Sequence, residues 1–284
     1  MTEEEKYNGV NLPEIQNYPV YWYRILSKLF FIFTFGLGSV FLSFIIFPVL
    51  RIFIHPKIKF QVQARKLVSA SFRFFCFLMK IFHVSKLQTE NPAAFKNFHS
   101  KIIVANHPSL LDFVYLMSLI PNADCIVSEK LKKNIIGGVV CQAYITNSMD
   151  FNLLCERCKK TLDQGNNIII FPEGTRTPRQ GTTSYKKGAA RIALYCNKNI
   201  QPVFIGGSDK YGLGKHNPLW SYNHVEPYLY DLKLLEEIHI QDFAGLSETI
   251  AAKRITDLIH KKILEANETY KSNHPLCKTI NNVI

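Results

Sequence analysis

Hydrophobic residues are most concentrated near the start of the chain, where residues 29–50 contain no charged side chain. An α-helix of that length rises about 33 Å, which is enough to cross a hydrocarbon core of about 30 Å. The run is too long and starts too late for a signal peptide, and no small-residue cleavage site follows it. Aromatic side chains precede it, as at a membrane–water interface: Tyr18, Tyr21, Trp22 and Tyr23. The pattern therefore predicts an N-terminal membrane helix.

A second apolar and aromatic stretch, residues 67–84, contains two charges, Arg73 and Lys80. This composition predicts an amphipathic helix that lies in the membrane interface, or a second arm that returns to the same face. Positive charges follow the first apolar run more densely than they precede it. They are Arg51, Lys57, Lys59, Arg65 and Lys66. By the positive-inside rule, a single span puts the rest of the chain in the cytoplasm, and so does a re-entrant pair.

Beyond residue 86 the pattern changes to short β-branched runs that alternate with longer apolar segments. Residues 101–105 and 166–171 have the length and composition of buried strands, whereas residues 110–120 and 153–162 are typical of helices. This alternation predicts an α/β fold with a mixed, mostly parallel sheet flanked by helices. The chain then divides into a juxtamembrane segment (1–28), a membrane-embedded helical element (29–86) and one catalytic domain (87–284).

The first motif with candidate chemistry follows the strand at 101–105, where residues 106–112 read Asn-His-Pro-Ser-Leu-Leu-Asp. His107 falls in the turn before a helix, and Asp112 falls in the first helical turn. A carboxylate that holds one imidazole nitrogen leaves the other free to take a proton from an alcohol. The spacing predicts a general base that activates a substrate hydroxyl, without a serine nucleophile. The alternative is a helix-capping aspartate beside a packed histidine.

The second motif occupies residues 171–176, which read Phe-Pro-Glu-Gly-Thr-Arg at the end of the strand at 166–171. Gly174 allows a tight turn, so Glu173 and Arg176 are expected at the carboxyl end of a parallel strand. Ligands of open α/β sheets bind at that end. Arg176 can donate two hydrogen bonds to a phosphate or carboxylate. A surface salt bridge between the two side chains is the alternative.

Two lysines precede the next predicted helix, at residues 189–195. Lys186 and Lys187 put positive charge at the start of that helix, where exposed backbone amides also attract anions. The second motif and these lysines together indicate an anionic substrate.

These motifs resemble those of the glycerolipid acyltransferases of the lysophosphatidate acyltransferase type. That family carries Asn-His-x4-Asp, Phe-Pro-Glu-Gly-Thr-Arg, a Lys-x-Gly stretch and an apolar block with proline, here residues 200–205. The resemblance covers residues 101–207. It implies transfer of a fatty acyl group from acyl-CoA or acyl-carrier protein to a free hydroxyl of a lysolipid. The acceptor that it favours is 1-acylglycerol-3-phosphate, which gives phosphatidate in phospholipid biosynthesis.

The resemblance also assigns roles to residues. His107 is expected to be the general base, with Asp112 as its partner. No metal and no cofactor besides the acyl donor are expected. The enzyme is expected to be integral to a membrane, such as a bacterial inner membrane, with its catalytic domain on the cytoplasmic face. The residues expected to bind substrate are Glu173, Gly174, Thr175, Arg176, Lys186 and Lys187.

One block departs from the family pattern. Family members often carry, between the two motifs, a segment close to Gly-x-Ile-Phe-Ile-x-Arg whose arginine contacts the acceptor phosphate. The corresponding residues 143–150 read Ala-Tyr-Ile-Thr-Asn-Ser-Met-Asp and contain no basic residue, and Arg157 lies well downstream. A lysolipid with another head group, such as a lyso-ornithine lipid, therefore remains an alternative acceptor.

Composition narrows the possible partners. The net charge of +12 implies an anionic partner, but no recognisable nucleic-acid-binding module accompanies it. Membrane lipids, an acidic carrier protein and coenzyme A phosphates account for the charge instead. The seven cysteines are scattered and odd in number, which suits reduced cytosolic thiols. Cys155 and Cys158 have neither a second pair nor a nearby histidine to complete a zinc site, so they are expected to pack within a helix.

Two other function classes remain open at this point. A catalytically silent lipid-binding scaffold would not require His107 and Asp112 to be intact. A thioester or lipid hydrolase would share the same base but activate water. Product analysis with and without an acceptor separates these classes from an acyltransferase.

Overall fold

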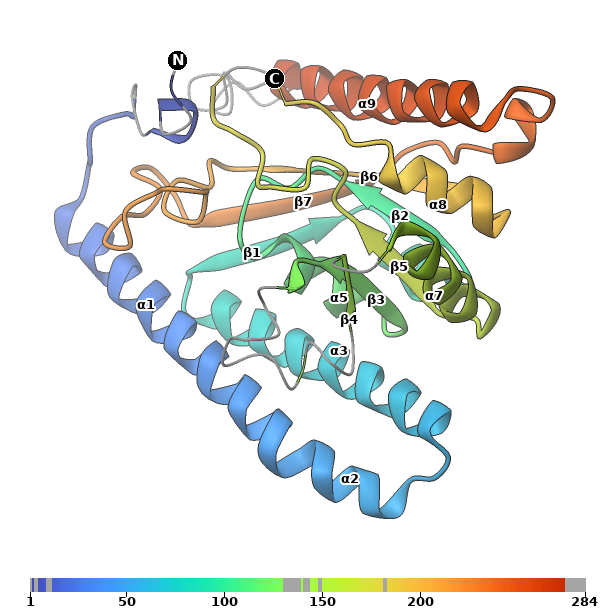
Figure 1. The fold of residues 1–284 in the computed structure, drawn as a ribbon. Coiled ribbons are helices and arrows are strands. Elements are labelled where there is room, and N and C mark those ends of the chain that lie inside the picture. Colours follow the sequence, from blue (N-terminus) through green and yellow to red (C-terminus); the bar gives the residue numbers. More distant parts are fainter. Residues whose placement is uncertain are drawn as a thin grey trace.

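The computed structural model describes residue 2 and residues 5–8, 12–129, 139, 144–147, 150–180 and 183–273. Within these residues a seven-stranded sheet forms, in the order β1-β7-β6-β2-β5-β3-β4 (Figure 1). Neighbouring strands are parallel except β6 and β7, which are antiparallel. The strands are β1 Ser85–Thr89, β2 Ile102–Ala105, β3 Ala123–Val127, β4 Tyr144–Thr146, β5 Asn167–Ile170, β6 Ile200–Gly207 and β7 Tyr228–Leu234. The mixed, mostly parallel α/β sheet predicted from the sequence is thus confirmed.

Helices cover both faces of the sheet, with α1, α3 and α5 on one side and α7, α8 and α9 on the other (Figure 1). Every residue of β2 and β5 is buried, because a central parallel strand packs against helices on both faces. The α-helices are α1 Tyr18–Phe41, α2 Phe47–Phe53, α3 Lys57–Ile81, α4 Pro92–Lys96, α5 Asp112–Leu119, α7 Phe151–Asp163, α8 Gly188–Cys196 and α9 Glu248–Asn273. Two short 3-10 helices are η1 Glu5–Tyr7 and η4 Ile240–Phe243, and η2 Leu42–Ile46 is a π-helical segment.

The N-terminal apolar run forms a continuous helix, Tyr18–Phe53, made of α1, η2 and α2. It begins eleven residues before the predicted run, because the Asn17 side chain accepts a hydrogen bond from the Val20 amide (3.1 Å) and caps it. By length and composition, this is the one helix among the described residues that could cross a membrane. Only 11% of its most apolar window is buried within the protein.

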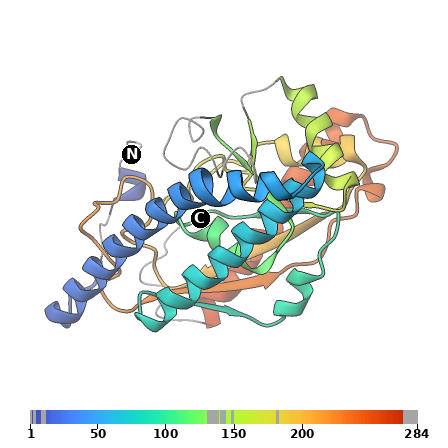
Figure 2. The same ribbon diagram turned by 90° about the horizontal axis from the view of Figure 1, so that it is seen from below.

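The second apolar segment is helix α3, which starts ten residues earlier than predicted, at Lys57. One face, including Val68 and Phe72, is buried against the sheet and α5, while Phe74 and Phe77 on the other face are exposed. Seen from below, α1 and α3 lie side by side (Figure 2), and their contact is aromatic, with the Phe35 and Phe72 rings 5.9 Å apart. Both helices therefore contribute to the domain core. The division of the chain at residue 86 stays a prediction.

A buried ion pair joins α3 to the sheet. The guanidinium of Arg65 donates to both carboxylate oxygens of Asp124 on β3, at 2.5 and 2.7 Å, and both residues are buried. Removing one partner of such a pair leaves the other charge buried without compensation, which costs several kcal/mol.

Replacement of Asp124 by Ala should therefore lower the free energy of unfolding by about 3–5 kcal/mol. The control is Asp163→Ala, which breaks the exposed pair with Lys159 and should cost less than about 1 kcal/mol. Urea unfolding of both variants in detergent micelles measures the two losses. Equal losses would show that the buried pair does not hold α3 against the sheet.

Candidate active site

The site begins where β2 leaves the sheet. The side chain of Asn106 pairs with the backbone of Ile205 on β6, donating from Nδ2 to its carbonyl oxygen (2.9 Å) and accepting from its amide (2.7 Å). This amide side chain takes the place of one more rung of the β2–β6 ladder. The asparagine of the first motif therefore fixes the point at which the chain turns away, with His107 directly after it.

His107 and Asp112 meet as the motif predicts. Nδ1 of His107 lies 2.8 Å from Oδ2 of Asp112, which is fully buried at the start of α5. The imidazole also stacks on the Phe171 ring, with centroids 4.2 Å apart and planes 20° from parallel. A carboxylate accepts hydrogen bonds, so Nδ1 carries the proton and Nε2 is free to act as a base. His107 is 19% exposed and lines a large cavity.

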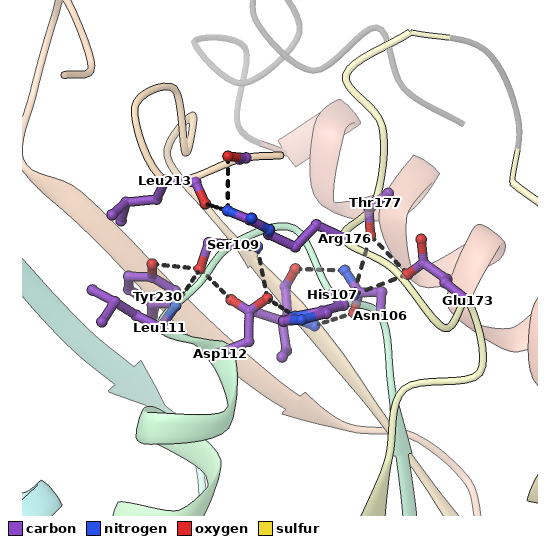
Figure 3. Close-up of polar contacts among 12 residues, drawn as sticks. Asn106, His107, Ser109, Leu111, Asp112, Glu173, Arg176, Thr177, Leu213 and Tyr230 are labelled. Atoms are coloured by element: carbon purple, nitrogen blue, oxygen red, sulfur yellow. Dashed lines mark hydrogen bonds and ion pairs between the residues drawn. The ribbon is translucent and has the colours of Figure 1, made fainter. Parts of the chain in front are cut away.

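The Asp112 carboxylate has two further donors, both from Ser109 (Figure 3). The amide of Ser109 donates to Oδ2 at 2.7 Å and its hydroxyl donates to Oδ1 at 2.6 Å. The hydroxyl of Tyr230 lies 2.7 Å from that of Ser109. Ser109 thus supplies two donors to the carboxylate of Asp112, the first residue of α5, whose N-cap residue is Leu111. Tyr230 on β7 carries no motif, and nothing in the sequence places it beside residue 109.

Glu173 of the second motif and the following Thr177 form hydrogen bonds to the backbone of His107 in the first motif. Oε1 of Glu173 accepts from the amide of His107 (2.9 Å) and from the hydroxyl of Thr177 (2.7 Å). The Thr177 amide in turn donates to the His107 carbonyl oxygen at 2.6 Å. Sequence reasoning missed Thr177, although it directly follows the motif. Glu173 is buried, and its contacts within the described residues are to the chain rather than to the cavity; its predicted contact with substrate stays a prediction.

Burial shifts the ionisation of Glu173. Its Oε2 is buried and makes no hydrogen bond within the described part of the chain. Desolvation raises the pKa of the carboxyl to about 7, although the hydrogen bonds from Thr177 and His107 oppose that rise. The group therefore changes charge near neutral pH.

Gly174 and Lys186 approach each other closely. Gly174 has a φ of +66°, and an added Cβ would lie 2.6 Å from Nζ of Lys186. The positive φ is what favours glycine here, since the flexible Lys186 side chain could move away from a Cβ. Lys186 and Thr175 line the same cavity as His107, whereas the exposed Lys187 precedes α8 and does not line it.

Arg176 is anchored to the loop after β6 (Figure 3). Its Nη1 donates to the carbonyl oxygens of Leu213 and Gly214, each at 2.8 Å. The Tyr7 hydroxyl donates to the Arg176 carbonyl oxygen at 2.9 Å. Within the described residues, Nε and Nη2 of this guanidinium make no hydrogen bond to protein. Part of the guanidinium is therefore committed to the fold, and part could bind an anion.

The cavity beside His107 has a volume of about 480 Å³. Besides His107, Gly174, Thr175 and Lys186, its walls are formed mainly by apolar side chains from α1, η2, α3, α5, α7, α8 and the strands. Among these are Phe35, Leu42, Phe72, Phe113, Ile126 and Leu154. A single mostly apolar chamber thus joins the base to the N-terminal helices.

The block that departs from the family pattern is only partly described, since residues 143, 148 and 149 lie outside the described residues. Of the rest, Tyr144–Thr146 is strand β4, and Asn147 lines the cavity. Arg157 is exposed on α7 and does not line the cavity.

The described cysteines carry no metal cluster. Cys155 and Cys158 are free and lie on the buried side of α7, within the core. Within the described residues, no group of three His, Cys, Asp or Glu side chains could hold a metal ion. Cys141 and Cys277 lie outside the described residues.

The sequence of this chain is similar to those of known acyltransferases. The family model described as Acyltransferase matches residues 86–206. A 1-acyl-sn-glycerol-3-phosphate acyltransferase of Helicobacter pylori is 32% identical over 135 residues, which cover 43% of this chain and 54% of that protein. The human 1-acyl-sn-glycerol-3-phosphate acyltransferase beta is 25% identical over 133 residues, 44% of this chain and 48% of that protein. The chain thus spans about half the length of these relatives.

A solved structure shares the fold. The crystal structure of the 1-acyl-sn-glycerophosphate acyltransferase PlsC from Thermotoga maritima matches 85% of this chain and 96% of its own, with a TM-score of 0.59 and 21% identity. At that identity the similarity establishes the architecture alone.

The pKa of Glu173 gives a test of the site. In the unfolded chain this carboxyl has its ordinary pKa of 4.5, so between 4.5 and about 7 only the folded state holds its proton. The contribution of Glu173 to the free energy of unfolding should therefore fall as pH rises through this window, by about 3 kcal/mol in total. Glu173→Gln cannot titrate, so the variant should gain stability relative to wild type from pH 5 to pH 8.

Urea unfolding at pH 5, 6, 7 and 8 measures this difference. The control is Glu90→Gln, because the Glu90 side chain is 83% exposed and should show no comparable trend. A constant difference between wild type and Glu173→Gln across this range would contradict the raised pKa.

Proposed function

We propose that the protein is a membrane-bound O-acyltransferase, a proposal supported by the match of residues 86–206 to the family model described as Acyltransferase. It moves a fatty acyl group from acyl-CoA or acyl-carrier protein to the free hydroxyl of a lysolipid. The observation that carries the proposal is the His107–Asp112 pair. Asp112 holds Nδ1 of His107 and leaves Nε2 free, and His107 lines the apolar cavity of about 480 Å³. A chamber of this size and character suits a hydrocarbon chain.

The reaction follows from that pair. Nε2 of His107 takes the proton of the acceptor hydroxyl while the hydroxyl oxygen attacks the thioester carbonyl carbon. Asp112 holds Nδ1 and stabilises the imidazolium that forms. Collapse of the tetrahedral intermediate breaks the carbon–sulfur bond, and the imidazolium returns the proton to the thiolate. An ester and a thiol result, and no covalent bond to the enzyme forms.

The oxyanion of the intermediate requires hydrogen-bond donors. The amide of Gly174 is used within its turn, since it donates to the Phe171 carbonyl oxygen at 3.1 Å. The Thr175 amide makes no hydrogen bond within the described residues, and Thr175 lines the cavity. We therefore assign the oxyanion to the Thr175 amide rather than to that of Gly174.

The proposed acceptor is 1-acylglycerol-3-phosphate, and the product is phosphatidate. The positive charge of Lys186 in the cavity wall supports a phosphate-bearing acceptor. So do Nε and Nη2 of Arg176, a residue outside the cavity wall, because these two nitrogens make no hydrogen bond within the described residues. The names of the relatives agree with this choice. A non-phosphate lysolipid is the second candidate, because residues 143–150 lack the block arginine and Nη1 of Arg176 already binds two carbonyl oxygens.

Membrane attachment is proposed through the helix Tyr18–Phe53, whose residues Phe35 and Leu42 also line the cavity. An acyl chain in the bilayer beside this helix is then close to the chamber. The positive charges after the first apolar run support a catalytic domain on the cytoplasmic face, where thioester donors are made.

The proposal is tested by replacing the base. His107→Ala should lower turnover by at least about 10²-fold, because the variant lacks a general base, while the protein still partitions into membranes. The control is the exposed His239→Ala, which should keep wild-type turnover. Mass spectrometry of products, with an acyl thioester and lysophosphatidate in bilayer mimics, is the measurement.

The same assay separates the alternatives. Phosphatidate formed only when His107 is present would support the proposal. Acyl transfer to lyso-ornithine lipid alone would move the acceptor, and release of free fatty acid without an acceptor would indicate a hydrolase. Wild-type turnover in His107→Ala would overturn the assignment of the base.

A further inference from the structure

The Asp112 carboxylate is fully buried, and every one of its hydrogen bonds within the described residues has a defined donor. Oδ2 accepts from His107 Nδ1 at 2.8 Å and from the Ser109 amide at 2.7 Å. Oδ1 accepts from the Ser109 hydroxyl at 2.6 Å. The orientation of the carboxylate that holds the base is therefore set by Ser109.

The direction of the next hydrogen bond follows from the count of protons. A serine hydroxyl has one proton, and an ionised carboxylate at 2.6 Å from Oγ requires it. Ser109 Oγ can therefore only accept from its other neighbours. These are the amide of Leu111, at 3.1 Å, and the hydroxyl of Tyr230, at 2.7 Å. Tyr230 donates, and the chain of bonds runs from Tyr230 through Ser109 to Asp112 (Figure 3).

The fold holds Tyr230 rigidly in place. It is fully buried on β7, between β1 and β6, and it stacks on the ring of Tyr115 with centroids 4.2 Å apart. Nζ of Lys210 lies 4.6 Å from the centre of the Tyr230 ring, on its face. Beside it, Gly207 has a φ of +110°, and an added Cβ would lie 1.8 Å from the Leu229 carbonyl oxygen. The glycine thus permits the close approach of β6 to the residue that precedes Tyr230.

We propose that Tyr230 is a positioning residue for the reaction: its hydroxyl orients Ser109, which orients Asp112 and through it His107. β7 lies beyond residues 86–206, so this residue comes from outside the part of the chain that matches the family model. The inference rests on the proposed function, because it assigns to Tyr230 a role in the use of His107 as a base.

This role has a kinetic signature. Tyr230 and Ser109 do not line the cavity beside His107, so their loss should not alter how either substrate binds. Their loss should alter only how well His107 and Asp112 stay aligned during proton transfer. Tyr230→Phe should therefore lower kcat by about tenfold, the worth of one hydrogen bond in such a network, and leave both KM values within about twofold. Ser109→Ala, which removes a donor from Asp112 itself, should lower kcat by more.

A double-mutant cycle separates this relay from a general loss of structure. If Tyr230 acts through Ser109, the double variant Ser109→Ala, Tyr230→Phe should have the kcat of Ser109→Ala alone. Losses that multiply would overturn the proposal, because they would show that Tyr230 acts independently of Ser109. Thermal unfolding of each variant in bilayer mimics establishes that the proteins compared are folded at the assay temperature.

The matched control is Tyr228→Phe. Tyr228 lies two residues earlier on the same face of β7 and is equally buried, but its hydroxyl donates to the Tyr211 carbonyl oxygen at 2.7 Å, outside the relay. This variant should keep kcat within about twofold of wild type. An equal loss in Tyr228→Phe and Tyr230→Phe would overturn the relay, since any lost hydroxyl on β7 would then have the same effect.

His107→Ala in the same assay distinguishes failure of the inference from failure of the proposed function. If His107→Ala is inactive but Tyr230→Phe has wild-type kcat, the relay is wrong and the base stands. If His107→Ala keeps wild-type kcat, the proposed function fails and the relay fails with it. Should Tyr230→Phe not fold, Ser109→Ala takes its place, and wild-type kcat in that variant would overturn the relay.

Discussion

The site depends on the need to satisfy one buried charge. The carboxylate of Asp112 is completely inaccessible to solvent, and an unpaired charge in such surroundings would cost several kcal/mol. The backbone and hydroxyl of Ser109 and the imidazole of His107 meet that need, with Tyr230 behind them. The same hydrogen bonds that stabilise the carboxylate also fix its direction, so the stability of the fold and the alignment of the base have one physical origin.

The two long motifs are joined by hydrogen bonds, although some sixty residues separate them. β2 and β5 are adjacent parallel strands, so the loops that follow them emerge at one edge of the sheet. There Glu173 and Thr177 bind the backbone of His107 on both its amide and its carbonyl side. A carboxylate next to a base suggests chemistry, yet most of the polar contacts of Glu173 stabilise the loop that carries the base. Its second oxygen is buried without a partner in the described residues, and desolvation of the buried carboxyl raises its pKa to about 7.

The N-terminal helices α1 and α3 each contact the protein core with one face and expose apolar side chains on the other. α3 buries one face in the core and is joined to β3 by the pair of Arg65 and Asp124, while its other face exposes phenylalanines. α1 packs on α3 through aromatic rings and contributes Phe35 to the wall of the cavity. An apolar surface that faces outward and a cavity that opens inward therefore share the same helices. The proposed membrane anchor lies close to the base, because Phe35 on α1 and His107 line the same cavity.

The sequence by itself determined the alternation of strands and helices, the N-terminal apolar helix and the approach of His107 to Asp112, because each depends on local periodicity or a short spacing. It did not determine the start of that helix, which a cap at Asn17 moves forward, or the contacts of Arg176 with the loop at 213–214. Nor did it place Tyr230 beside Ser109. The Asn17 cap is a local contact that lies outside the apolar run. The contacts of Arg176 and Tyr230 join residues far apart in the chain, and only the order and register of strands β2, β5, β6 and β7 bring them together. Hydrogen bonds across such distances leave no periodic trace in a single sequence, so the tertiary structure alone decided them.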